Sequence, residues 1–145
     1  MSRDILVPVD KSPRSEKAFE YVLEELSDPT IILLHVINPV SVFGHASADG
    51  IFDVEEYRQA EQQRREHAEQ LLEEYREKAR ERGLEVTTSL QIGKPVKRIL
   101  ETAEEHDIDH IVMGSHGRSG VGRVLLGSVA ETVTRRSPVP VTIIR

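Results

Sequence analysis

Residues 113–128 have the sequence MGSHGRSGVGRVLLGS, and this stretch decides the fold that we predict for the 145-residue chain. It holds five of the nine glycines, a residue used where the backbone takes positive φ or is closely approached. The stretch follows an apolar run, Ile108 to Met113, that indicates a buried strand. At its other end, Ser128 and Glu131 form a Ser-x-x-Glu capping box, which is typical of a helix start.

A glycine-rich loop between a strand and a helix presents unpaired amide groups at the positive end of the helix dipole. Such a loop is an anion site, and phosphate is the usual anion. The alternative is that these glycines only form turns in a surface loop. The position of the loop, directly before a helix start, favours the anion site.

The composition narrows the class of protein. With 38% hydrophobic and 30% charged residues, the 145-residue chain is expected to form one globular domain. A net charge of −6 argues against a general binder of nucleic acid or anionic membranes. The absence of cysteine excludes disulfides, thiol catalysis and zinc–thiolate sites. Since there is no apolar run of ~20 residues and no signal-peptide core, we expect a cytoplasmic protein.

Strand and helix patterns alternate along the chain. The predicted strands are 5–9, 30–36, 86–92, 108–113 and 139–144, and the helices between them begin near residues 13, 53, 95 and 128. The near-alternating pattern of the third strand and Pro140 in the last one place both near sheet edges. This order predicts an α/β fold with one open, five-stranded parallel sheet and helices on both faces.

The second helix, from about Asp53 to Arg82, is longer than its apolar stripe. Only its C-terminal half carries the stripe, formed by Ala68, Leu71, Leu72, Tyr75 and Ala79. We therefore expect the charged N-terminal half to project into solvent or to rest on a partner protein. The preceding loop, residues 38–52, is long for a compact domain and is either a lid or interface segment or a tolerated insertion.

The strand order follows from where the polar residues lie. In open α/β sheets, ligands bind beyond the carboxyl ends of the strands, where the strand order reverses. Asp10 follows the first strand and the glycine-rich loop follows the fourth. Both belong to one crevice only when these two strands are neighbours, so we predict the order 3-2-1-4-5. Val36, at the end of the second strand, then borders the same crevice.

The residue types suggest how this crevice would hold a phosphorylated ligand. Backbone amides of residues 114–117 and 127–129 can bind phosphate, and the Ser128 hydroxyl adds a donor. Arg118 and Arg123 either screen phosphate charge or are solvated loop cations. Asp10 suits ribose hydroxyls or a Mg²⁺ ion, and otherwise caps a helix. Val36 is either an apolar wall for a base or part of the core.

Motifs of catalysis are missing from the sequence. Gly93-Lys94-Pro95 is not a Walker A motif, and no G-x-G-x-x-G follows the first strand. His116 lies in the glycine-rich loop without an evident oriented partner, which favours a positioning role, and Ser115 is not in a nucleophile elbow. His106 and His110 straddle a helix end and a strand start and need not share a face. We therefore assign no catalytic residue.

The spacing Gly114-x2-Gly117-x9-Gly127-Ser128 resembles the ATP-binding signature of the universal stress protein family. The resemblance covers nearly the whole chain. It includes Ile5 to Ser12, Leu34-His35-Val36, Gly93-Lys94-Pro95, residues 109–117 and residues 125–131.

This resemblance implies a Rossmann-like sheet of the adenine-nucleotide α-hydrolase type, ordered 3-2-1-4-5, and a homodimer paired through the last strand, Val139 to Ile144. It also implies that ATP, with Mg²⁺ bound at Asp10 as one option, is the ligand. Positions matching Pro8, Asp10 and Val36 face the adenosine in ATP-binding members. The positions that take the ribose and phosphates match Met113, Gly114, His116, Gly117, Gly127, Ser128 and Val129.

The expected function is an ATP-binding stress-response or signalling module whose nucleotide occupancy is the output. The alternative is a slow ATPase or phosphotransferase, with Asp10 holding Mg²⁺ and His116 or Arg123 near the γ-phosphate. A third hypothesis is a scaffold that binds an unknown protein through the second helix and residues 38–52.

Overall fold

The computed structural model describes residues 3–39, 53–115 and 126–145. In these residues strands and helices alternate as the sequence predicts. The strands are β1 (Arg3–Pro8), β2 (Pro29–Ile37), β3 (Val86–Ile92), β4 (His110–Gly114) and β5 (Val141–Ile144). The helices are α1 (Pro13–Glu25), α2 (Val54–Glu81), α3 (Pro95–Glu105) and α4 (Ser128–Arg136).

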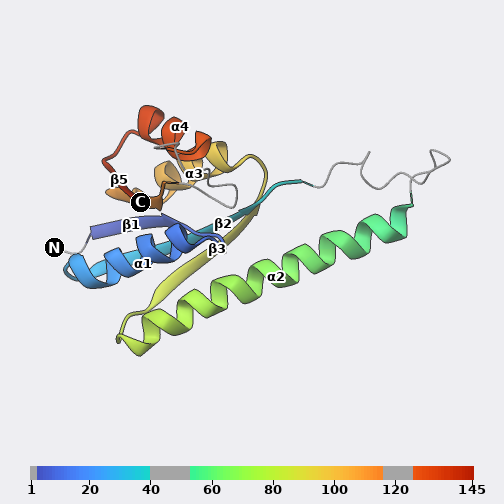
Figure 1. The fold of residues 1–145 in the computed structure, drawn as a ribbon, viewed down its shortest axis with the longest axis horizontal. Helices are drawn as coiled ribbons and strands as arrows, with labels where there is room; N and C mark the ends of the chain where they lie inside the picture. Colours follow the sequence, from blue (N-terminus) through green and yellow to red (C-terminus); the bar gives the residue numbers. More distant parts are fainter. Residues whose placement is uncertain (1–2, 40–52, 116–125) are drawn as a thin grey trace.

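The described strands form one parallel sheet in the order β3-β2-β1-β4-β5 (Figure 1). This confirms the predicted fold class and strand order, with β3 and β5 at the edges. Two apolar cores cover the sheet: one lies against α1 and α2, and the other against α3 and α4. Successive β1 residues alternate between them, because neighbouring side chains of a strand point to opposite faces. Ile5 and Val7 pack on the first core and Leu6 on the second.

The two central strands separate toward their carboxyl ends. β1 pairs with β2 along its whole length, but its registered pairs with β4 end at Leu6–Ile111. Beyond Leu6 the chain stays with β2, because the Val9 amide donates to the Leu34 carbonyl at 2.8 Å. The chain then continues from β1 into α1 on one face and from β4 toward α4 on the other. This divergence is the switch point where α/β sheets bind ligands.

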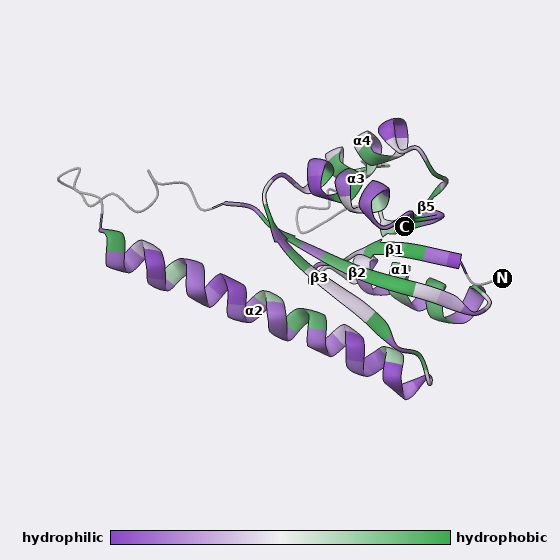
Figure 2. Ribbon diagram, turned by 180° about the vertical axis from the view of Figure 1, so that it is seen from behind, coloured by the Kyte–Doolittle hydropathy of each residue, from purple (hydrophilic) through white to green (hydrophobic). Residues whose placement is uncertain are grey.

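Helix α2 extends well past the sheet (Figure 1). Its buried residues are the predicted stripe of Ala68, Leu71, Leu72, Tyr75 and Ala79. The other end is mostly hydrophilic (Figure 2), and its first residue, Val54, is 56% exposed. The first turns of this half therefore extend beyond the sheet, as they would in either predicted case, in solvent or on a partner protein. No helix in the described ranges is both long enough and apolar enough to cross a membrane.

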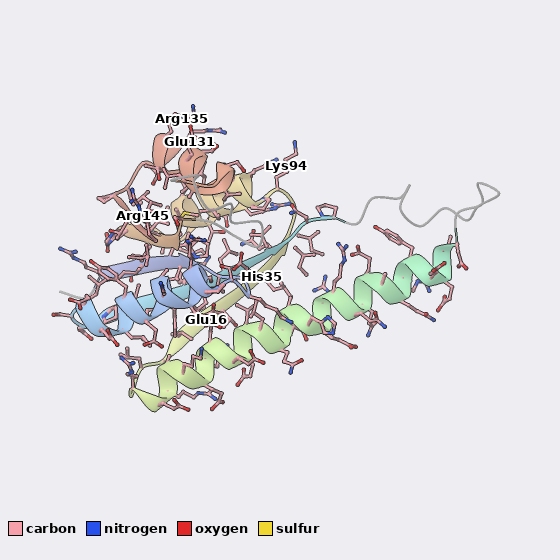
Figure 3. All side chains as sticks on the ribbon, in the orientation of Figure 1. Glu16, His35, Lys94, Glu131, Arg135 and Arg145 are labelled. Carbon is pink, nitrogen blue, oxygen red and sulfur yellow. The ribbon has the colours of Figure 1, made fainter. Side chains whose placement is uncertain are left out.

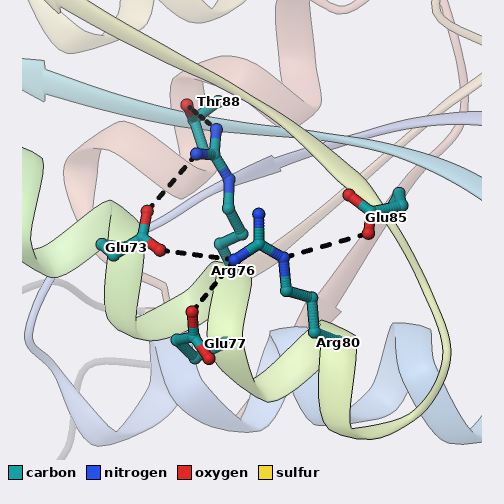
Figure 4. Close-up of polar contacts among 6 residues, drawn as sticks. All are labelled: Glu73, Arg76, Glu77, Arg80, Glu85 and Thr88. Carbon is teal, nitrogen blue, oxygen red and sulfur yellow. Dashed lines mark hydrogen bonds and ion pairs between the residues drawn. The ribbon is translucent and has the colours of Figure 1, made fainter.

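Polar contacts also fasten the C-terminal half of α2 to the domain (Figure 4). Arg76 donates to the Thr88 hydroxyl of β3 at 2.9 Å and pairs with Glu73 at 3.3 Å. Arg82, which follows the helix, pairs with Glu20 of α1 at 2.8 Å. Exposed ion pairs contribute little each, about 0–1 kcal/mol, so the apolar stripe supplies most of the attachment.

Two helices, α1 and α2, begin at a side-chain cap, and α1 and α3 begin with a proline. The Ser12 hydroxyl accepts from the Ser15 amide at 3.2 Å and Pro13 opens α1, as predicted. Asp53 caps α2 by accepting from the Glu56 amide at 3.0 Å. Pro95 is the first residue of α3, also as predicted.

The predicted capping box of α4 is wrong. The N-cap is Gly127, Ser128 is the first helical residue, and the cap has no side-chain hydrogen bond. The Gly127 amide donates to the Ser115 carbonyl at 2.7 Å, and the Gly127 carbonyl accepts from Glu131 at 2.9 Å. This tie to the end of β4 holds Gly127 at the cap position, so the helix begins one residue earlier than the motif suggests.

The two serines give a matched test of helix capping. Replacing Ser12 by alanine should lower the free energy of unfolding by about 1 kcal/mol, because the Ser15 amide loses its buried acceptor. Ser128→Ala should change it by no more than ~0.5 kcal/mol, because Ser128 caps nothing and is exposed. Urea denaturation of both variants beside the wild type checks this. Equal losses would contradict the capping assignment.

Candidate functional site

A cavity of about 580 Å³ lies at the carboxyl ends of β1, β2 and β4. The N-terminus of α4 and residues of α2 and α3 complete its wall. It is lined by every described residue of the predicted set: Pro8, Asp10, Val36, Met113, Gly114, Gly127, Ser128 and Val129. His116, Gly117, Arg118 and Arg123, predicted for the same crevice, lie outside the described residues. Four segments far apart in the sequence therefore meet at the switch point.

Asp10 lies in the turn between β1 and α1 and is partly buried. One of its carboxylate oxygens, Oδ1, accepts a hydrogen bond from the Ser12 amide at 2.7 Å. This bond is an Asx turn that stabilises the entry into α1, so part of the helix-capping alternative is present. Within the described ranges, the second oxygen, Oδ2, accepts no hydrogen bond. The carboxylate can thus support the turn and still offer an acceptor to a ligand.

The two ends of the glycine-rich segment are tied to each other and to the sheet. The Ser115 amide donates to the Ile144 carbonyl of β5 at 2.8 Å, and the Ser115 carbonyl accepts from Gly127 at 2.7 Å. Ser115 and Gly127 therefore lie beside each other at the end of β4. The first amides of α4, those of Ser128, Val129 and Ala130, follow this tie. They have no carbonyl partner within the helix, which leaves them for an anion at the positive end of its dipole.

Gly114 is required by the packing of the protein itself. A Cβ at this position would lie 2.9 Å from the carbonyl carbon of Arg14 and 3.0 Å from its oxygen. Helix α1 therefore passes so closely over the end of β4 that only glycine fits. This close approach brings the turn that holds Asp10 beside the start of the glycine-rich segment.

The β2 side of the crevice carries an apolar residue and a histidine. Val36 is half-buried and packs against the core under α3 and α4. The ring of His35, labelled in Figure 3, lies with Nδ1 2.7 Å from the Val9 carbonyl oxygen. Because a carbonyl only accepts, this nitrogen carries the proton and Nε2 remains an acceptor in the neutral ring. Sequence reasoning noted His35 only within the family motif and did not assign it to the site.

Helix α2 supplies a wall that sequence reasoning missed. Arg64, His67, Ala68 and Leu71 line the cavity and lie at three- and four-residue steps on one helix face. Arg64 is exposed and donates to the Asn38 carbonyl beyond β2 at 3.1 Å. The apolar stripe that places Ala68 and Leu71 in the core continues one turn into Arg64 and His67. That continuation was the available signal.

His110 lies at the amino end of β4, away from the cavity. Its Nε2 is 2.7 Å from the Thr142 hydroxyl of β5. Burial, with a smaller contribution from Arg3, lowers the pKa of His110. Its ring therefore links the two strands in the neutral form.

A sequence model of the universal stress protein family matches residues 1–145. The chain belongs to the universal stress protein family. It is 33% identical to universal stress protein YxiE of Bacillus subtilis, with 100% of both chains covered. It is 31% identical to universal stress protein MJ0577 of Methanocaldococcus jannaschii, covering 100% of this chain and 96% of the relative.

Solved structures of universal stress proteins share the fold. The structure of MJ0577 matches with a TM-score of 0.80 at 30% identity, covering 98% of this chain and 94% of that one. A family member from Arabidopsis thaliana, solved with AMP bound, matches with a TM-score of 0.68 at 23% identity and coverages of 98% and 90%. A universal stress protein in complex with cAMP matches with a TM-score of 0.65 at 24% identity and coverages of 99% and 97%.

The close approach at Gly114 can be tested by adding one methyl group. Gly114→Ala should lower the free energy of unfolding by about 1–3 kcal/mol, because α1 has to move away from β4. It should also shift the amide NMR signals around Arg14. Gly83→Ala is the control. A Cβ at Gly83 meets nothing within 4 Å, so this variant loses stability only because alanine disfavours the left-handed φ of +75°. Unchanged signals around Arg14 in Gly114→Ala would contradict the close approach.

Proposed function

We propose that this universal stress protein is a single-domain ATP-binding module whose nucleotide occupancy is its output. The observation that carries the proposal is the meeting of the eight described predicted residues in one cavity beside the N-terminus of α4. Adenine nucleotides are bound in two structures that share this fold, one with AMP and one with cAMP. These support a nucleotide as the class of ligand.

The phosphates would lie at the α4 end of the cavity. The amides of Ser128 and Val129 and the Ser128 hydroxyl are the described donors there, and the helix dipole favours an anion at the same position. A hydrogen bond to a charged oxygen contributes roughly 1.5–3 kcal/mol, so a few such donors suffice for useful affinity. By the family resemblance, His116 and Gly117 would add contacts, and Arg118 and Arg123 would screen the phosphate charge.

The adenosine would lie at the β1 and β2 end. Pro8 and Val36 provide apolar surface for the base, as ligand pockets usually do. Asp10 would accept from the ribose hydroxyls through Oδ2. The described residues include no group of three or more His, Asp or Glu side chains that could hold a metal ion. A Mg²⁺ ion would therefore take most of its ligands from phosphate oxygens and water.

The same proposal includes a homodimer formed through β5. This strand lies at the edge of the described sheet, and each of its residues is partly exposed. An open strand edge offers unpaired backbone groups to a second copy of the strand. The fastening of Ser115 to Ile144 makes β5 a direct neighbour of the glycine-rich segment.

ATP binding can be measured by isothermal titration calorimetry with the purified protein. We expect a dissociation constant well below 1 mM, because several charge-assisted hydrogen bonds act together. Titrations with and without Mg²⁺ show how much the ion increases the affinity for ATP. No heat of binding at millimolar ATP would contradict the proposal. ADP formed in the same samples, above the rate in buffer, would instead indicate the slow ATPase or phosphotransferase.

An experiment can distinguish whether the Asp10 carboxylate contacts the ribose or binds a metal ion. Asp10→Asn keeps an acceptor for the Ser12 amide but removes the charge, so ATP and AMP should both bind roughly fivefold to tenfold more weakly. The loss should be the same with and without Mg²⁺ if the carboxylate contacts ribose. Asp53→Asn, the same change at the exposed cap of α2, is the control. A loss seen only with Mg²⁺ would contradict the ribose contact.

A further inference from the structure

Three hydrogen bonds close a ring around Asp10, and one of its members comes from α2. The Asp10 amide donates to the Ser15 hydroxyl oxygen at 2.9 Å. The Ser15 and Tyr75 hydroxyl oxygens are 3.1 Å apart, and the Tyr75 hydroxyl lies 2.9 Å from the Asp10 carbonyl oxygen. The ring joins the turn after β1, the first turn of α1 and the C-terminal half of α2.

The direction of every bond in this ring is fixed. A carbonyl oxygen only accepts, so the single hydroxyl proton of Tyr75 goes to Asp10. The bond between the two hydroxyls must then use the proton of Ser15. Each hydroxyl thus donates once and accepts once, and both backbone groups of Asp10 are satisfied. Hydrogen bonds arranged in such a cycle polarise one another and are stronger together than singly.

This hydrogen-bonded ring is buried, and the Tyr75 side chain in it is closely packed. Tyr75 is 3% exposed and Ser15 is 4% exposed. Phe19 packs edge-to-face on the Tyr75 ring with centroids 5.1 Å apart, and the Lys78 ammonium lies 5.6 Å from the centroid. Burial is the main cause that raises the pKa of Tyr75 to about 12, so its hydroxyl stays protonated as a donor at neutral pH.

These contacts leave one polar atom of Asp10, Oδ2, open to a ligand. Its amide and carbonyl are held by the ring, and Oδ1 is held by the Ser12 amide at 2.7 Å. Within the described residues only Oδ2 accepts nothing, and Asp10 lines the cavity. Without the Tyr75 hydroxyl, the Asp10 carbonyl would be left without its donor, and the turn would relax to satisfy it.

We propose that Tyr75 is a positioning residue, whose hydroxyl reaches from α2 to hold the turn so that the Asp10 carboxylate faces the ligand. The effect on ligand binding rests on the proposed function, whereas the effect on the turn does not. Tyrosine occupies the centre of an apolar stripe in which phenylalanine would fill the same space. Its hydroxyl is therefore the part that packing alone does not require.

The first experiment measures the turn in the nucleotide-free protein by amide hydrogen exchange. Tyr75→Phe should speed exchange at the Asp10 and Ser12 amides roughly fivefold to tenfold, as expected for the loss of one buried hydrogen bond. Exchange at Val22, in the middle of α1, should stay unchanged. The control is Thr102→Val, which removes a fully buried hydroxyl that donates to the Arg98 carbonyl at 2.7 Å on α3. It should leave Asp10 and Ser12 protected.

The second experiment measures ATP affinity in a double-mutant cycle. Tyr75→Phe alone should weaken binding roughly threefold to tenfold, whereas Thr102→Val should not. In an Asp10→Ala background, Tyr75→Phe should weaken binding no further, because the carboxylate that it positions is gone. A structural role would give the same loss in both backgrounds.

The outcomes separate the two proposals. Full protection of Asp10 and Ser12 in Tyr75→Phe, equal acceleration at all amides, or additive losses in the cycle would each overturn the positioning role. If the wild type binds no ATP, the proposed function fails. The exchange measurement then decides alone whether Tyr75 holds the turn.

Discussion

The separation of β1 from β4 is the constraint on which the rest of the structure depends. Parallel strands buried on both faces need helices on both faces, and the chain has to change direction across the sheet once. Here it does so between its two central strands, where β1 stays with β2 beyond Leu6. Helix α1 then crosses the end of β4 at Gly114. The cavity is what remains between elements that leave the sheet on opposite faces.

Helix α2 borders this crevice with its middle turns, and its first turns extend well past the sheet. Its apolar stripe packs on the sheet, and Tyr75 holds the turn of Asp10. Arg64 and His67 line the cavity about two to three turns earlier in the same helix. The polar first half continues the same rigid element past the sheet (Figure 1). Anything that displaced the projecting half would act on the cavity wall and on the Asp10 turn through one helix.

Much of the fold could be predicted because its signals are local. Apolar runs of four to seven residues mark buried strands, and Ser12-Pro13 and Gly93-Lys94-Pro95 carry the chemistry of helix starts. The strand order needed one further inference, that Asp10 and the glycine-rich loop share a crevice. The predicted residues within the described ranges then met in one cavity, since their position at strand ends was enough to place them.

The parts of the site that could not be predicted from the sequence depend on contacts between distant segments. The stripe of α2 predicts that Tyr75 is buried, but nothing in its spacing indicates that its hydroxyl meets Ser15 and Asp10, 60 and 65 residues away. Gly114 was attributed to backbone freedom or ligand approach, whereas the atom that excludes a Cβ belongs to Arg14. Likewise, the continuation of the α2 stripe into Arg64 and His67 marks one helix face, but the spacing alone does not place that face at the cavity, because that depends on the path of β2.

The wrong prediction at the start of α4 has a consequence for the site. Had Ser128 been the N-cap, its hydroxyl would accept from the Glu131 amide and be unavailable to a ligand. Instead the Gly127 carbonyl accepts from Glu131, and Ser128 begins the helix with an exposed side chain at the cavity wall. The tie between Gly127 and Ser115 thus does two things at once. It joins the two ends of the glycine-rich segment, and it leaves the serine hydroxyl and the first free amides of the helix open to a ligand at the cavity wall.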